Sequence, residues 1–296
     1  MASPDFSDRD GLIWIDGKIL PWRDAKVHIL THGLHYASAV FEGERCYSGN
    51  IFKSQEHSER LVRSADLIDM KMTMTVDQIN QAKEEILEAN KLKDAYLRPV
   101  AWRGSEQMGI SAQATLTHVA IACWEWPSYF SPEMREKGIS LQTGKWRAPA
   151  PDTAPTASKA SCLYATHTMS KHAAEHNGYT DALMLDYRGL VAEATGANLF
   201  MVKDGQIKTP IPDCFLNGLT RQTVIQLAKD LGLPIEETRI KPEELAKADE
   251  VFLTGTAAEV TAVGKIDDVT YKVGPVTRQL RDAYESLVRG KKAAAA

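Results

Sequence analysis

Two Asp-Gly dipeptides within alternating apolar residues constrain the fold of this chain more than any other feature. Asp16-Gly17 stands inside residues 14–20, and Asp204-Gly205 stands inside residues 200–207. Each predicts a β-hairpin, because Asp-Gly fits the tight turn that suits the twist of two paired strands. Residues 182–192 predict a third hairpin around Arg188-Gly189. Antiparallel sheet is therefore expected in both halves of the chain.

Helices are expected between and after these strands. Residues 75–78, Thr-Val-Asp-Gln, form a capping box that opens a segment with its apolar residues on one face. We expect the Lys and Glu side of this helix to face solvent. A second helix is expected from about Thr220 to Leu231 and a third over about residues 275–288. The sequence therefore predicts a mixed α/β (α+β) fold.

A proline-rich segment separates the two halves. Residues 146–157 contain three prolines and few large apolar side chains, so they cannot build a core. The chain of 296 residues is long enough for two modest domains. We therefore expect two domains that are joined near this segment.

Composition excludes several classes of protein. Hydrophobic residues make up 44% and charged residues 25% of the chain, which is ordinary for a folded soluble protein. The net charge is -4 and the basic residues are scattered among acids, so a nucleic-acid partner is not expected. No apolar stretch approaches a membrane span, so no membrane partner is expected. Four dispersed cysteines and a polar beginning predict a reduced, cytoplasmic protein.

Short motifs for nucleotide, zinc-protease and α/β-hydrolase chemistry are absent from the sequence. His172 and His176 have the spacing of two metal ligands on one helical face. No third ligand is suggested nearby, and such histidines also suit a helix end. We therefore expect no metal site.

Four features are candidates for chemistry. Lys159 lies among small uncharged residues, where an ammonium loses hydration and the neutral, nucleophilic amine is favoured. Residues 217–221, Asn-Gly-Leu-Thr-Arg, run into a helix and offer backbone N–H groups to an anion. Residues 253–259 form a small-residue turn after a strand, and Glu193 follows a strand among small residues. Taken singly, each also suits a surface lysine, a helix cap, a tight turn or a solvated acid.

In their order along the chain, these features resemble the fold-type IV family of pyridoxal-phosphate enzymes, and specifically the branched-chain aminotransferases among the class IV aminotransferases. The resemblance covers nearly the whole chain. It begins at residues 34–45, Leu-His-Tyr-Ala-Ser-Ala-Val-Phe-Glu-Gly-Glu-Arg, continues through residues 57–61 and 96–99, and ends at residues 255–260. Each motif alone is weak, but their joint occurrence in the family order is specific. Ser161-Cys162, Ala197 and Ala262 depart from the family pattern, which bears on fine substrate preference.

The resemblance implies a pyridoxal 5'-phosphate cofactor and a role for several residues in holding it. Lys159 is implied to be the catalytic residue, which forms the internal aldimine and moves the proton. Glu193 is implied to keep the pyridine nitrogen protonated, and Tyr164 to hydrogen-bond the ring oxygen. The implied ligands of the phosphate group are Arg60, Leu219, Thr220 and Thr256.

The same resemblance implies a substrate pocket with two modes of binding. Its aromatic, Met and turn residues would hold an apolar side chain and the α-carboxylate; these are Tyr36, Phe41, Tyr96, Met108, Trp126, Ala257 and Ala258. Arg98, helped by Tyr36 and Tyr129, is implied to bind the distal carboxylate of glutamate. A structural ion pair is the alternative for Arg98.

The implied reaction is ping-pong transamination of L-leucine, L-isoleucine and L-valine with 2-oxoglutarate, giving branched-chain 2-oxo acids and L-glutamate. The implied architecture has a small N-terminal α/β domain over residues 1–128, a connection over 129–157, and a larger domain over 158–296, with the cofactor at their interface. The family forms homodimers or larger assemblies, so a homo-oligomer is expected.

Three other functions stay open. A D-amino-acid or (R)-amine transaminase shares the lysine and the cofactor, but its arginine usually pairs with a histidine at the position of Val100. Aminodeoxychorismate lyase shares the cofactor without explaining the fuller pattern. A non-catalytic binding protein, or a Schiff-base enzyme without a cofactor, is the interpretation from another class.

Overall fold

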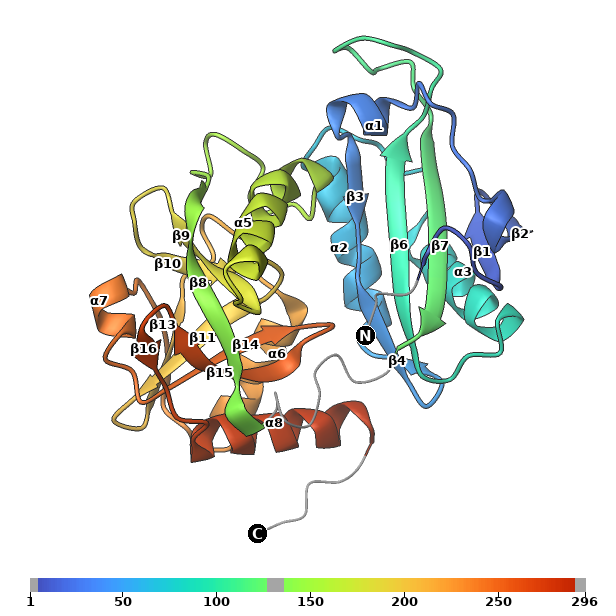
Figure 1. Ribbon diagram of the computed structural model, residues 1–296. Helices are drawn as coiled ribbons and strands as arrows, with labels where there is room; N and C mark the ends of the chain where they lie inside the picture. Colours follow the sequence, from blue (N-terminus) through green and yellow to red (C-terminus); the bar gives the residue numbers. More distant parts are fainter. Residues whose placement is uncertain (1–4, 127–135, 291–296) are drawn as a thin grey trace. The chain divides into compact units, whose positions relative to one another are not determined.

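The computed structural model describes residues 5–126 and 136–290, which divide into two compact units (Figure 1). The first unit comprises Met1–Pro127 with Ser158–Cys162, and the second comprises Ser128–Ala157 with Leu163–Ala296. Both units combine strands and helices, which confirms the predicted α/β class. Among the described residues, no helix has both the length and the apolar character that a membrane span requires.

The first unit is built on a seven-stranded sheet in which β2, β1, β7, β6, β4 and β5 are neighbours in that order and β3 pairs with β6. The strands are β1 (Leu12–Ile15), β2 (Lys18–Pro21), β3 (Ala39–Phe41), β4 (Glu44–Tyr47), β5 (Asn50–Ile51), β6 (Ala95–Arg103) and β7 (Thr117–Glu125). Two helices, α2 (Ser54–Asp66) and α3 (Val76–Ala89), pack against it and against each other. The short helices η1 (Trp22–Asp24) and α1 (His32–Tyr36) lie in the connections.

Local signals in this unit are confirmed. Ile15 pairs with Lys18 across Asp16-Gly17, which is the predicted two-residue hairpin. The Thr75 side chain accepts from the Gln78 amide and the Gln78 side chain accepts from the Thr75 amide, so the capping box closes in both directions. The predicted apolar face of α3 then reaches the core through four buried residues, Ile79, Ala82, Ile86 and Leu87.

The second unit contains a nine-stranded sheet, six strands of which form a closed ring. The order is β10, β9, β8, β15, β14, β11, β12 and β13, with β16 beside β15, and β10 also pairs with β11. The strands are β8 (Ile139–Ala148), β9 (Asp181–Asp186), β10 (Val191–Ala194), β11 (Asn198–Lys203), β12 (Gln206–Pro210), β13 (Ile235–Thr238), β14 (Glu250–Gly255), β15 (Glu259–Ile266) and β16 (Val269–Thr270). The hairpins around Asp204-Gly205 and Arg188-Gly189 form as predicted.

Helices cover this second sheet (Figure 1). The helices of this unit are α5 (Tyr164–His176), α6 (Leu219–Asp230), α7 (Pro242–Leu245) and α8 (Pro275–Val288), and the short helix η2 (Ser161–Leu163) precedes α5. The helix α5 packs on β8 and β9, and α6 and α8 pack together against β14. Both predicted helices near 220 and 275 are confirmed. The Glu250 carboxylate accepts from the amide of Thr277 at 2.8 Å and so caps α8.

Two features in the middle of the chain bear on the predicted domain boundaries. Residues 139–148 were expected in a connection, but they form β8 and pair with β9 and β15 inside the sheet. Ser158–Cys162 was expected in the C-terminal domain, but its contacts place it with the first unit. The reason is that Ala160 bridges Val40 and is buried in the first core. The interdomain boundaries otherwise stay a prediction.

Lys83 corrects the expectation that the Lys and Glu side of α3 faces solvent. Its side chain is fully buried, and its Nζ donates to Glu44 Oε2 at 2.9 Å and to the Ser54 carbonyl at 2.8 Å. Glu44 is also fully buried, and burial raises its pKa. Lys83 is buried because its partner Glu44 lies on β4. No pattern of residues within α3 reveals this contact.

We predict that Lys83→Ala lowers the free energy of unfolding by about 3–5 kcal/mol, because it leaves the Glu44 carboxylate buried without its cation. Urea denaturation would measure the loss. Glu84→Ala, on the exposed side of the same helix, is the matched control and should change stability by less than about 0.5 kcal/mol. A loss for Lys83→Ala no greater than that of the control would contradict the prediction.

Candidate active site

Lys159 is held by backbone contacts inside the first unit. Its amide donates to Ser64 Oγ at 3.0 Å, and its carbonyl accepts from the Phe41 amide at 3.2 Å. Ser158 Oγ donates to the Ser64 carbonyl at 2.8 Å, which fixes the preceding residue. The Lys159 Nζ lies 4.9 Å from the centre of the Phe41 ring. A half-buried amine at a fixed position beside an aromatic face can act as a nucleophile or a base.

Arg60 is oriented by a buried carboxylate. Its Nε and Nη2 donate to the two oxygens of Glu42, each at 2.7 Å, and His57 Nδ1 lies 2.7 Å from Glu42 Oε2. Burial opposes the ionised form of Glu42, but Arg60 and His57 outweigh burial and hold the pKa of Glu42 well below its ordinary value. The bidentate pair fixes the plane of the guanidinium.

Arg98 and Tyr96 form an aromatic and cationic cluster on β6. Arg98 Nη2 donates to the Tyr96 hydroxyl at 3.1 Å, and its guanidinium carbon lies 4.8 Å from the Phe41 ring centre. The Tyr96 ring packs on Trp126 at 4.9 Å between centroids. Within the described residues Arg98 has no carboxylate partner, and its Nε is buried without a hydrogen bond. This argues against the structural ion pair that was the alternative for Arg98.

The other predicted residues of this unit lie further out. Tyr36 ends α1 with its side chain partly exposed, and its ring packs on His32. Met108 is exposed in the connection between β6 and β7. Tyr129 lies outside the described residues.

Glu193 lies in the second unit, where β10 meets β11. It pairs with Asn198, and Asn198 in turn pairs with Thr254 on β14. Asn198 Nδ2 donates to Glu193 Oε2 at 3.0 Å, and His167 Nε2 lies 3.5 Å from Glu193 Oε1. The buried Thr254 hydroxyl has no hydrogen-bond partner among the described residues. A carboxylate, an amide and a hydroxyl thus stand in a row across three strands.

Asn198 also holds the turn that leads to Leu219 and Thr220. Its Nδ2 donates to the Leu216 carbonyl at 3.0 Å, and its Oδ1 accepts from the Gly218 amide at 3.2 Å. A side chain on Gly218 would collide with Asn198 Oδ1. Leu219 and Thr220 form the first turn of the 12-residue helix α6, whose first amides have no acceptor within the helix. This arrangement suits an anion at the helix end.

The remaining predicted residues form the turn from β14 to β15. Thr256, Ala257 and Ala258 connect Gly255 to Glu259, which pair across the hairpin. Ala257 and Ala258 line a pocket of about 240 Å³ within this unit, together with Tyr164, His167, Thr195 and Lys171. The second unit thus brings Tyr164, Ala257 and Ala258 to one pocket. His167, which faces Glu193, lines the same pocket.

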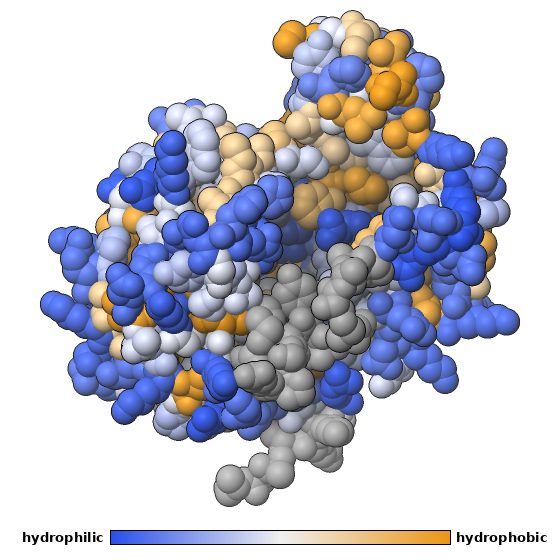
Figure 2. Space-filling model, viewed as in Figure 1, coloured by the Kyte–Doolittle hydropathy of each residue, from blue (hydrophilic) through white to orange (hydrophobic). Residues whose placement is uncertain are grey.

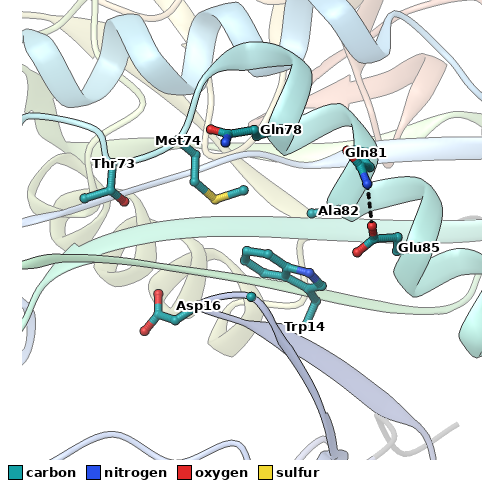
Figure 3. A pocket seen from close by; sticks show the side chains of 9 residues that line it. Trp14, Asp16, Thr73, Met74, Gln78, Gln81, Ala82 and Glu85 are labelled. Atoms are coloured by element: carbon teal, nitrogen blue, oxygen red, sulfur yellow. Dashed lines mark hydrogen bonds between the residues drawn. The ribbon is translucent and has the colours of Figure 1, made fainter.

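One pocket and one cluster elsewhere among the described residues do not involve the predicted residues. A pocket of about 500 Å³ lies between β1 and α3, where Trp14 faces Met74 and Gln81 donates to Glu85 (Figure 3). Asp186, Asp213 and Cys214 lie within 4.8 Å of one another. Arg188 bonds both of these carboxylates, and burial and the two acids raise the pKa of Cys214 to about 12.

Comparisons with known proteins agree on one family. The amino-transferase class IV model matches residues 39–266. The chain belongs to the class IV aminotransferase family. A probable branched-chain-amino-acid aminotransferase from Rickettsia felis is 44% identical over 281 residues, which is 94% of this chain and 96% of that protein. The family that the motifs predicted is therefore confirmed.

Solved structures of class IV aminotransferases also share the fold. The branched-chain aminotransferase of Thermoproteus uzoniensis, solved with norvaline, has a TM-score of 0.92 and 35% identity, covering 96% of this chain and 97% of that chain. The branched-chain amino acid aminotransferase of Thermobaculum terrenum, solved in its PLP-form, has a TM-score of 0.88 and 34% identity, covering 96% of this chain and 95% of that chain.

Three residues that contact the predicted site residues were not singled out in the sequence. Glu42 lies inside the motif of residues 34–45, and its place beside Phe41 could have suggested a role. Asn198 follows Glu193 by five residues in the segment that was singled out, but its three hydrogen bonds depend on the fold. His167, one turn after Tyr164, had no signal of its own.

We predict that Gly218→Ala lowers the free energy of unfolding by about 1–3 kcal/mol, because the methyl group forces Asn198 away from Glu193 and Leu216. Urea denaturation of the full chain would measure this. Gly196→Ala is the matched control, since nothing lies within 4 Å of a side chain added there. Equal stability of the two variants would show that Asn198 can move at no cost.

Proposed function

We propose that this chain is a pyridoxal-phosphate-dependent transaminase that exchanges the amino group between L-leucine, L-isoleucine or L-valine and 2-oxoglutarate. The observation that carries the substrate choice is Arg98. Its guanidinium is half-buried among aromatic rings and, within the described residues, lacks a carboxylate. Such a group suits the distal carboxylate of one substrate, while the rings around it suit an apolar side chain.

The donor set fits a phosphorylated pyridine. The Gly218 turn and the first turn of α6 present amides to a phosphate group, and Arg60 presents an oriented guanidinium. Glu193 offers a carboxylate to a protonated ring nitrogen, beside the Thr254 hydroxyl, which has no hydrogen-bond partner in the part of the chain that the structure describes. We therefore propose that Lys159, Arg60, Tyr164, Glu193, Leu219, Thr220 and Thr256 hold pyridoxal 5'-phosphate.

When bound, this cofactor supplies an aldehyde that amines attack and a ring that accepts electrons. The residues of the chain do the rest. The Lys159 amine gives and takes the proton at the substrate carbon, and Glu193 keeps the ring nitrogen protonated. The amides of the Ala257-Ala258 turn bind the α-carboxylate. Because the first product, an oxo acid, leaves this pocket before the second substrate enters it, the kinetics are ping-pong.

We also propose that the enzyme is a cytoplasmic homo-oligomer. All four cysteines are free thiols, which suits a reducing compartment. Large apolar side chains are exposed at the end of the first unit that carries α1 and the connection from β6 to β7 (Figure 2); they include Ile29 at 74%, Leu34 at 61% and Ile110 at 85%. A patch of this kind supports association with a second copy.

We expect purified protein with pyridoxal 5'-phosphate to form glutamate from L-leucine and 2-oxoglutarate, because the proposed pocket accepts both. Glutamate formation would be followed enzymatically, with D-alanine and (R)-1-phenylethylamine as parallel amino donors. Lys159→Ala should remove turnover, and Lys145→Ala, an exposed lysine on β8, should keep it. Turnover with a D- or (R)-donor alone would replace the branched-chain assignment with the related transaminase.

We predict that Arg98→Met lowers kcat/KM for 2-oxoglutarate roughly 100-fold, because the distal carboxylate loses its charged partner. The leucine half-reaction should change less than about threefold, since it makes no use of the charge. Single-turnover kinetics with each substrate would separate the two effects. Arg98→Lys keeps the charge without the planar fork, so its kcat/KM for 2-oxoglutarate should lie between the values for wild type and Arg98→Met. Equal losses with both substrates would assign Arg98 a structural role.

A further inference from the structure

We propose that His167 is a positioning residue that holds the Glu193 carboxylate, as an imidazolium, in place for the ring nitrogen of the cofactor. The inference rests on the proposed function, because Glu193 meets the ring nitrogen only if pyridoxal 5'-phosphate binds there. In this role His167 acts through Glu193 and not on the reacting atoms.

The hydrogen bonds of His167 define which nitrogen carries a proton. Nδ1 lies 2.9 Å from the Leu163 carbonyl oxygen, one turn back on α5. Since a carbonyl only accepts, Nδ1 must donate. Nε2 is then the nitrogen that faces Glu193 Oε1 at 3.5 Å. A carboxylate also only accepts, so this contact is attractive when Nε2 is protonated and repulsive when it is bare.

The surroundings of His167 favour the protonated form. Its ring is buried, which opposes the charge, but the hydrogen bond and charge of Glu193 and the Leu163 carbonyl outweigh burial and raise the pKa of His167. Asp181 adds to the rise. Lys171 lies one turn further along α5, lines the same pocket and is itself paired with Asp181 at 3.7 Å, so its charge is partly offset.

With His167 charged, both oxygens of Glu193 have a donor. Asn198 holds Oε2 from β11, and His167 faces Oε1 from α5. The carboxylate is thereby fixed from two elements, β11 and α5. The His167 ring also packs on Tyr164, with 5.5 Å between centroids. One side chain thus contacts both Glu193 and Tyr164, two of the residues that the proposed function assigns to the cofactor.

The first test needs no cofactor. In the full chain, NMR titration of labelled histidines should show His167 titrating above the ordinary histidine value of about 6.5. Glu193→Gln should bring that midpoint down, because it removes the charge that favours the imidazolium. An unchanged midpoint in Glu193→Gln would overturn the inference while leaving the proposed function intact.

The second test is the affinity for pyridoxal 5'-phosphate as a function of pH. His167→Gln should bind it roughly tenfold more weakly than wild type at pH 6. A raised pKa means that the contribution of His167 is fully present below the ordinary value and is lost as pH rises through the value in the fold. The deficit should therefore shrink at high pH. A deficit of the same size at every pH would indicate a merely structural role and overturn the inference.

His172→Gln is the matched control, because His172 is an exposed histidine on the same helix. It should leave the affinity and its pH dependence unchanged. A wild-type chain that binds no pyridoxal 5'-phosphate, with the Glu193-dependent titration of His167 intact, would refute the proposed function rather than the contact.

Discussion

The first unit depends on the burial of one ionised carboxylate, that of Glu42, between β3 and β4. Removing a carboxylate from water is costly unless cations and donors surround it, and here Arg60 and His57 both come from α2. These two contacts therefore fix how α2 is rotated about its axis and how far along the strands it lies. The flanking residues extend the effect: the Phe41 amide binds the Lys159 carbonyl, and Gly43 leaves space for the Tyr96 hydroxyl. Three consecutive residues thus fix three predicted site residues.

Much of the fold was predictable because its signals are local. Asp16-Gly17, the Thr75 capping box and the ends of α6 and α8 each depend on residues a few positions apart. The β8 strand was missed because its two neighbours in the sheet, β9 and β15, come later in the sequence and no turn signal marks it. The burial of Lys83 was also missed, because its partner Glu44 lies on β4, far from α3 in the sequence.

The candidate site shows the same division. Lys159, Glu193 and the turn residues were found through motifs, which identify residue types in order along the chain. Their supports were not found, because a support is defined by a contact and not by a pattern. Ser64 holds Lys159 from 95 residues away, and nothing near Ser64 marks it in the sequence. The family resemblance adds residue roles but gives no account of these supporting contacts.

The closure of the ring of strands in the second unit has a consequence for how this protein can change. The ring closes through the single pair Glu193 and Asn198, and Asn198 also seats the turn before α6. Glu193 therefore both closes the ring of strands and is the acidic residue of the predicted site. A substitution at Glu193 or Asn198 would therefore disturb the closure of the ring of strands and the predicted site together.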